Sequence, residues 1–255
     1  MDIVLILKIL LLSFIQGISE FFPISSSGHL VIFQKILNFN SIPLIYDIFF
    51  HIGTLLSVVI FFFSDIKELV TNFYKKENFN FIVLILIASI PTALIGLFFR
   101  KPLEGLFDKP GLVGYFLLLT ALILILSKYF RVKKMNIYLT ALLIGTFQGI
   151  AIIPGISRSG FTISAGLILS MGFLFSFRFS FLLSIPAILG ALLLEISKIP
   201  FETTQIFYLL MGTVFSAVFG FAALVLLKKI ILKDKFHYFA YYCIVAGIFA
   251  LIFIR

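Results

Sequence analysis

The chain is dominated by long apolar segments, and these constrain its fold more than any other feature. Six of them run over about 44–63, 81–99, 111–130, 175–197, 206–227 and 238–254. A helix needs about 20 apolar residues to cross the roughly 30 Å hydrocarbon core of a bilayer. The segments contain Ser, Thr, Gly and Pro rather than a polar residue at every second position, which favours helices over an outer-membrane barrel. The sequence therefore predicts an all-α polytopic membrane protein.

The composition supports a membrane protein and argues against nucleic-acid binding. Hydrophobic residues make up 62% of the chain and charged residues 12%, whereas a soluble domain is about 45–50% apolar and about 25% charged. The net charge is +9, but the Lys and Arg residues lie in short links between apolar segments and do not form one patch with interleaved aromatic residues. Topology signals and attraction to anionic lipid account for this charge, so the lipid bilayer is the expected partner.

Two short polar stretches interrupt the apolar pattern, and they resemble each other. The first runs from Gln16 to His29 and the second from Gln148 to Gly160. Aligned without gaps at an offset of 132 residues, they share identical residues at Gln16, Gly17, Ile18, Ser25, Ser27 and Gly28, which fall on Gln148, Gly149, Ile150, Ser157, Ser159 and Gly160. Polar groups at membrane depth are costly and by default mark a functional site. We therefore predict that the two stretches form the active site.

The layout around these stretches predicts an inverted repeat. Each stretch is flanked by apolar segments that are short for a crossing, namely 3–18 and 28–37 in the first half and 137–153 and 161–173 in the second. We interpret each pair as a re-entrant helix-loop-helix, followed by three transmembrane helices. Because three is odd, the second half is inverted relative to the first. The chain is then a single membrane domain of two repeats, about 1–130 and 137–255, with its site near the midplane.

The distribution of basic residues predicts the orientation. The links 64–80, 128–136 and 228–237, together with Arg178, carry 12 Lys and Arg residues, and the opposite side carries 7. The positive-inside rule makes the first side cytoplasmic. Both termini and the mouth of the first re-entrant loop then face the outside.

The residue types in the two polar stretches indicate recognition of an anion, most plausibly a phosphate. Residues 25–28 read Ser-Ser-Ser-Gly and residues 157–160 read Ser-Arg-Ser-Gly, each just before an apolar helix whose N-terminal amides favour phosphate. Arg158 adds a planar fork for two phosphate oxygens. The predicted substrate-binding residues are Ser25, Ser27, Gly28, Ser157, Ser159, Gly160 and Thr162. Helix packing is the alternative for the serines taken alone, but it does not account for Glu20, His29 and Arg158 together.

The first stretch also contains the groups that a hydrolase needs. Ser26 becomes a nucleophile when a base removes its proton, and His29 lies three residues later, a spacing that brings side chains together on a helix. Glu20 could orient His29, hold a divalent cation or act as acid and base itself. Gln16 lies four residues before Glu20 and could share the metal. The implied reaction is hydrolysis of a phosphate monoester or a diphosphate, with Arg158 stabilising the charge of the transition state.

Three further polar residues are interpreted as peripheral. Asp47 and His51 lie four residues apart at the start of the first full crossing, where an interfacial pair is favoured over groups that support the site. Glu195 ends a crossing near Lys198 and is also interpreted as interfacial.

The chain resembles the bacterial undecaprenyl-diphosphate phosphatase family of the bacitracin-resistance (BacA/UppP) type. The motifs that carry the resemblance are Gln16–Glu20, Phe22–His29, Tyr46–Leu56 and Pro154–Thr162. The resemblance implies removal of the terminal phosphate from undecaprenyl diphosphate in the bacterial cytoplasmic membrane, which regenerates the lipid carrier for peptidoglycan synthesis.

The resemblance also implies roles for individual residues. Glu20 matches the family's acidic motif, Ser26 its proposed nucleophile and His29 its catalytic histidine. Its phosphate-binding loop is matched by Ser157, Arg158 and Thr162. A divalent cation, magnesium or calcium, is implied as cofactor. Gln16 stands where the motif has Glu or Gln, and an amide is a poorer ligand for a hard cation than a carboxylate.

Several alternatives stay open at the level of sequence. The phosphoryl acceptor is Ser26 or His29, and an oligomer is compatible with the sequence. A long polyprenyl diphosphate explains a site inside the bilayer, because its chain cannot leave the lipid. The alternative function is an inverted-repeat transporter or flippase that binds a lipid phosphate or another anion without cleaving it.

Overall fold

The computed structural model describes residues 3–37, 44–99, 105–106, 109–133, 135–196 and 206–254, and this part of the chain contains no strand. Its helices are α1 (Ile3–Phe21), α2 (Ser26–Ile36), α3 (Leu44–Phe61), α4 (Phe63–Thr71), α5 (Lys76–Phe98), α7 (Pro110–Tyr129), α8 (Ile137–Ile150), α9 (Arg158–Ile168), α10 (Phe173–Ile196), α11 (Ile206–Leu232), the 3-10 helix η2 (Phe236–Tyr238) and α12 (Phe239–Phe253). The prediction of an all-α protein is confirmed.

Five of the six predicted crossings are segments long enough to span a membrane by themselves, and α1, predicted as a short re-entrant segment, is long enough as well. Among the described residues, six helical segments are long and apolar enough to cross a membrane: α1, α5, α7, α10, α11 and η2 with α12. A seventh is formed if α3 and α4, which meet at a bend of 69°, are counted as one span. Large apolar side chains stay exposed along these helices, among them Leu86, Leu193 and Val245. Such surfaces suit contact with lipid, and the protein is a multi-pass membrane protein.

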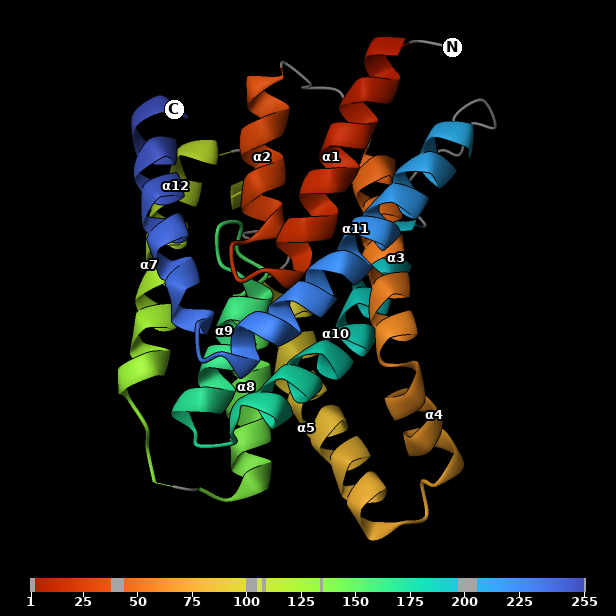
Figure 1. Cartoon of the computed structure of the whole chain (residues 1–255), viewed down its shortest axis with the longest axis vertical. Helices are drawn as coiled ribbons and strands as arrows, with labels where there is room; N and C mark the ends of the chain where they lie inside the picture. The colour runs from red at the N-terminus through yellow and green to blue at the C-terminus, as the bar shows by residue number, and fades with distance from the viewer. Residues whose placement is uncertain are drawn as a thin grey trace.

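The two polar stretches form the tips of two helical hairpins. The α1–α2 hairpin and the α8–α9 hairpin enter from opposite ends of the molecule and meet near its centre (Figure 1). Proline in each tip, Pro23 and Pro154, cannot donate the backbone hydrogen bond that continues a helix. The opposed hairpins agree with the inverted arrangement predicted for these segments, whereas equivalence of residues 1–130 and 137–255 as whole repeats stays a prediction.

The first polar stretch is more helical than the sequence interpretation allowed. Gln16–His29 was placed between two short helices, but α1 continues to Phe21, and only residues 22–25 form the turn. The helix reaches this far because the polar side chains of its last two turns find partners on the helix itself: Gln16 bonds to Glu20, and Ser19 donates to the Ile15 carbonyl at 2.5 Å.

Helix α11 lies across α1 and α3 and holds the first hairpin in place (Figure 1). A side-chain carbon on Gly17 would lie 2.8 Å from Phe219 Cβ, so only glycine permits this approach of α1 to α11. Below the hairpin tips lies a core rich in phenylalanine, in which Phe181 packs against Phe21, Phe62 and Phe177. The site is thus built on rigid, closely packed helices.

Ion pairs join the links that were predicted to share one side of the membrane. Lys128 pairs with Asp234, and Arg178 Nε lies 2.7 Å from Asp65 Oδ1. The orientation itself stays a prediction. Its charge count includes basic residues outside the described ones, namely Arg100, Lys101, Lys134, Lys198 and Arg255.

Candidate active site

The N-termini of α2 and α9 are capped in the same way. Ser25 Oγ accepts a hydrogen bond from Gly28 N at 3.3 Å, and Ser157 Oγ accepts one from Gly160 N at 3.1 Å. Such caps satisfy a backbone donor that the first turn of a helix leaves unpaired. The equivalence predicted from the alignment of the two stretches therefore holds for the capping hydrogen bond, whereas the backbone differs, with a φ of 68° at Ser25 and −80° at Ser157.

The two tips are bonded to each other. Gly155 N donates to Ser25 Oγ at 3.0 Å, and Ser159 Oγ donates to the Phe22 carbonyl at 3.3 Å. The second tip thus supplies both donors and the first tip both acceptors, and the two contacts are buried or partly buried. The starts of α2 and α9 are consequently fixed next to each other.

Helix α7 supports the second tip from behind. Thr120 Oγ1 donates to the Gly155 carbonyl at 3.0 Å and accepts from Ser157 N at 3.1 Å. Gly155 has a φ of +96°, a conformation that glycine adopts without steric cost. This turn places Arg158, the first residue of α9, against the end of α1.

The carboxylate of Glu20 is the centre of the site. Arg158 Nη2 donates to Glu20 Oε1 at 2.7 Å, and Ser26 Oγ donates to Glu20 Oε2 at 2.7 Å. Gln16 Nε2 donates to the same Oε2 at 3.2 Å. Glu20 and Arg158 thus join the two stretches, which agrees with the prediction that these stretches form one site. The hydroxyl of Ser26 faces a group that can take its proton.

Arg158 retains an unused donor. Its Nη1 is buried and has no hydrogen-bond partner among the described residues, while its guanidinium lies 5.5 Å from the centre of the Phe181 ring. A buried donor without a partner costs about 1–3 kcal/mol or more when it is charged. The arrangement is therefore suited to an additional anionic ligand that accepts from Arg158.

A cavity of about 750 Å³ adjoins these groups. One wall is polar and contains Glu20, Ser25, Ser26, Ser27, Ser157 and Arg158. Another part of the lining comes from α5 and α10 and is mostly apolar, with Ala93, Gly96, Leu97, the run 186–188 and the run 190–194. The cavity can therefore accommodate a ligand with a phosphate at one end and hydrocarbon at the other.

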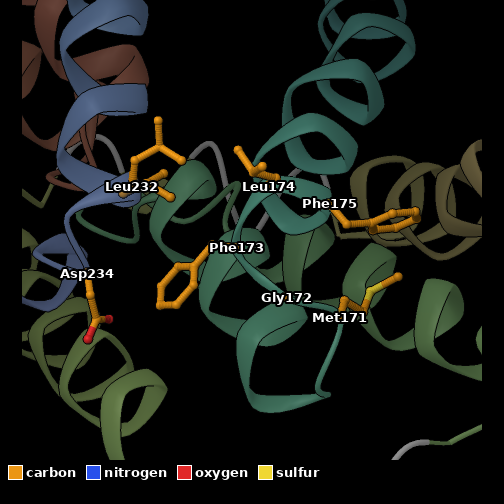
Figure 2. Close-up of a pocket in the computed structure, with 8 residues that line it drawn as sticks. Met171, Gly172, Phe173, Leu174, Phe175, Leu232 and Asp234 are labelled. Carbon is orange, nitrogen blue, oxygen red and sulfur yellow. The ribbon is translucent and has the colours of Figure 1, made fainter.

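A second cavity, of about 480 Å³, lies between the start of α10 and the end of α11 and lacks such chemistry (Figure 2). Its lining is apolar apart from Asp234 and backbone groups, with Phe173, Leu174 and Leu232 among its side chains. The carboxylate of Asp234 points away from these apolar side chains (Figure 2) and pairs with Lys128.

The structure corrects the predicted surroundings of His29. Its Nδ1 donates to the Ser25 carbonyl at 2.8 Å, and its Nε2 lies 2.7 Å from the Tyr242 hydroxyl. Neither ring nitrogen bonds to Ser26 or Glu20. The predicted pairing of His29 with Ser26 is therefore wrong in this structure, and the option that Glu20 orients His29 is not supported. A spacing of three on α2 places His29 and Ser26 on the same side of the helix, but Ser26 turns to α1 and His29 turns to α12.

His51 takes the place beside Glu20 that was expected for His29. Its Nδ1 donates to the Asp47 carbonyl at 2.8 Å, and its Nε2 lies 3.8 Å from Glu20 Oε2. Asp47 and His51 both line the cavity, so the alternative in which they support the site is favoured over a peripheral pair. Glu195 also lines the cavity, and its interfacial position stays a prediction. The signal that could have found them is the Tyr46–Leu56 motif, in which both polar residues are embedded.

Some predicted binding residues lie behind the cavity. Thr162 Oγ1 bonds to the Arg158 carbonyl at 2.8 Å and to Ser180 at 2.5 Å. Ser159 and Gly160 are buried, and Gly28 packs against Gly155. These residues shape the tips that carry Ser26 and Arg158 instead of lining the cavity.

The fit of a divalent cation can be judged from the donors around Glu20. The described residues contain no group of three or more His, Cys, Asp or Glu side chains placed to hold a metal. Gln16 turns its amide nitrogen to Glu20, and its Oε1 is buried without a partner. This set fits a cation held mostly by phosphate oxygens with one protein carboxylate, as is usual for magnesium.

Fold and site together define a multi-pass membrane protein with an anion site built from the tips of two opposed helical hairpins. The model of the family described as bacitracin resistance protein BacA matches residues 9–249. The chain belongs to this family.

Relatives across almost the whole length carry one name. The chain is 42% identical over 254 residues to an undecaprenyl-diphosphatase of Halothermothrix orenii, with 97% of each chain covered. It is 40% identical over 252 residues to one of Methanococcus maripaludis, covering 96% of this chain and 99% of the relative. It is 39% identical over 247 residues to one of Thermosipho africanus, covering 94% of this chain and 97% of the relative.

Proposed function

We propose that the protein hydrolyses undecaprenyl diphosphate to undecaprenyl phosphate and inorganic phosphate, and so recycles the lipid carrier for cell-wall synthesis. The observation that carries the proposal is the Ser26–Glu20–Arg158 contact on the polar wall of the cavity. Glu20, the proton acceptor, therefore contacts both the nucleophile Ser26 and the positively charged guanidinium of Arg158. The name that the relatives share, undecaprenyl-diphosphatase, supports the same substrate.

The chemistry follows from these contacts. The terminal phosphate binds against Arg158, whose free Nη1 donates to it, and the polyprenyl chain lies along the apolar wall. Ser26 Oγ attacks the terminal phosphorus while its proton passes to Glu20 Oε2. The bond from phosphorus to the bridging oxygen breaks, and undecaprenyl phosphate leaves. Arg158 stabilises the negative charge on the phosphoryl oxygens in the transition state.

Magnesium or calcium belongs to the proposal as a cation that enters with the substrate. Glu20 would be its protein ligand, and the other ligands would be diphosphate oxygens and water. When bound, it would neutralise phosphate charge as a Lewis acid.

Location and assembly complete the proposal. Membership of the family supports a location in the bacterial cytoplasmic membrane. The charge count favours an orientation in which the cavity opens to the external side, where the carrier is released in its diphosphate form. The hairpins and their supporting helices come from one chain, so a monomer contains the complete site, and an oligomer is compatible with it.

The test is phosphate release from undecaprenyl diphosphate by the purified protein in detergent, with and without magnesium. We expect release by the wild type and a loss of about 10²–10³-fold in Arg158→Ala, the magnitude for removal of one stabilising group. The loss in Ser26→Ala should be larger, because that change removes the nucleophile itself. Ser64→Ala, on the exposed side of α4, is the matched control. Binding of the lipid without release under any metal condition would support the alternative, a transporter or flippase of lipid phosphate.

A further inference from the structure

His29 and His51 are held by the same local bond but face different partners. Each donates Nδ1–H to the carbonyl four residues earlier on its own helix, Ser25 for His29 and Asp47 for His51, both at 2.8 Å. A carbonyl only accepts hydrogen bonds, so Nδ1 carries the proton in both rings, and Nε2 of each neutral ring has a free lone pair. Which histidine can act as a base therefore depends on what faces Nε2.

The lone pair of His29 is occupied, whereas that of His51 faces the site. Tyr242 O–H lies 2.7 Å from His29 Nε2, and His29 is buried and does not line the cavity. His51 Nε2 is directed to Glu20 Oε2 at 3.8 Å, a separation longer than a hydrogen bond. The His51 side chain is 32% exposed and lines the cavity, so water has access to it.

The same carboxylate oxygen joins His51 to the nucleophile. Glu20 Oε2 lies 2.7 Å from Ser26 Oγ and 3.8 Å from His51 Nε2. A phosphoryl group carried by Ser26 would thus be within reach of a water bound to His51.

We propose that His51 is the general base for the second half of the reaction, in which water removes the phosphoryl group from Ser26. This inference rests on the proposed function. Water attacks phosphorus and gives one proton to His51 Nε2. The bond from Ser26 Oγ to phosphorus breaks, and Glu20 returns to Oγ the proton that it took in the first half. Inorganic phosphate is released, Ser26 and Glu20 are restored, and His51 passes its proton to water in the cavity.

Two bases are needed because Glu20 is occupied in this step. After the first half it holds the proton of Ser26, and a protonated carboxyl group cannot accept a second one from water. His51 is placed to fill this role because its Nε2 faces the cavity and lies near Glu20 without being bonded to it. The sequence prediction that a histidine assists the reaction is thereby transferred from His29 to a residue on α3.

The experiment follows the terminal phosphate of undecaprenyl diphosphate labelled with ³²P, in the full-length protein, by rapid acid quench. We expect His51→Gln to release phosphate about 10²–10⁴-fold more slowly, the usual contribution of a general base, and to accumulate label on the protein. The label should be absent from the His51→Gln/Ser26→Ala double variant. The matched control is His237→Gln, in η2, outside the residues that line the cavity.

A second variant keeps the test independent of folding. His51→Ala should regain part of its phosphate release when imidazole is added, because free imidazole can replace the missing base in the cavity. Phosphate release by His51→Gln at the wild-type rate would overturn the inference. So would slow release without labelled protein, because His51 would then act before the phosphoryl transfer. If the wild type itself binds the lipid and releases no phosphate, the proposed function fails. That outcome is distinct from failure of the inference on His51, which requires an active wild type.

Discussion

Gly28 and Gly155 pack backbone to backbone at the point where the two hairpin tips meet: a side-chain carbon on Gly28 would lie 3.0 Å from the Gly155 Cα. There is no free space for a side chain next to this contact either, because the same carbon would also lie 3.0 Å from Val113 on α7. The spacing of the tips, and with it the distance from Arg158 to Glu20, is set by the absence of a side chain at this position.

Gly28→Ala should therefore separate the tips. The added methyl group has only backbone and a packed Val113 as neighbours, and overpacking of this kind costs about 1–3 kcal/mol. We expect a lower melting temperature in detergent and a fall in phosphate release. Gly105→Ala is the control, because a side-chain carbon there meets no atom within 4 Å. Equal melting temperatures for the two variants would contradict the close contact of the tips.

Substitutions of Glu20 and Arg158 should have coupled effects on the free energy of unfolding as well as on activity. Both side chains are largely buried, with 7% and 15% exposed. Removing one partner leaves the other charge uncompensated, which costs about 3–5 kcal/mol. We expect Glu20→Gln and Arg158→Gln each to lower the free energy of unfolding by about this amount, and the double variant to lose clearly less than their sum. Additive losses in a double-mutant cycle would show that the two charges do not interact.

Tyr242→Phe tests the role of His29. The change removes the hydroxyl that bonds to His29 Nε2 and leaves a buried polar atom without its partner, which costs about 1–3 kcal/mol. If His29 holds α2 against α12, the melting temperature should fall while kcat measured well below it stays within about threefold of the wild type. A large loss of kcat in the folded variant would restore His29 to the reaction, as the family resemblance implies.

Magnesium should bind measurably only together with a diphosphate. Glu20 is the single carboxylate in contact with Ser26 and Arg158, and the described residues hold no cluster of metal ligands. We expect magnesium alone to leave the melting temperature unchanged, and magnesium with a non-hydrolysable diphosphate lipid to raise it more than the lipid alone. Stabilisation by magnesium without lipid would indicate a site built by the protein itself.

The fold and the centre of the site could be predicted from sequence because both depend on local signals. Apolar segments of about 20 residues define helices in a bilayer, and the repeated Ser-X-Ser-Gly pattern places a capped helix start after each proline. Charge in an apolar environment requires a partner, and Glu20 and Arg158 are each other's partner.

The partner of each histidine could not be predicted, because it depends on contacts distant in sequence. His29 and Tyr242 are separated by 213 positions, and no local pattern brings α12 to α2. For His51, the i and i+4 spacing with Asp47 suggested a side-chain pair, but the bond is made to the Asp47 backbone, which frees the ring to face Glu20. Spacing defines which face of a helix a residue occupies and not which neighbour that face meets.

The division of the site between two hairpins has a consequence for how the protein is made. Glu20 and Ser26 leave the ribosome more than 130 residues before Arg158 does, and domains form from the N-terminus during synthesis. The first hairpin therefore enters the membrane with a carboxylate whose counter-ion has not yet been synthesised. A nascent or truncated chain without the second hairpin cannot cleave its substrate. Insertion of that hairpin brings Arg158 to the charge of Glu20 and completes the site.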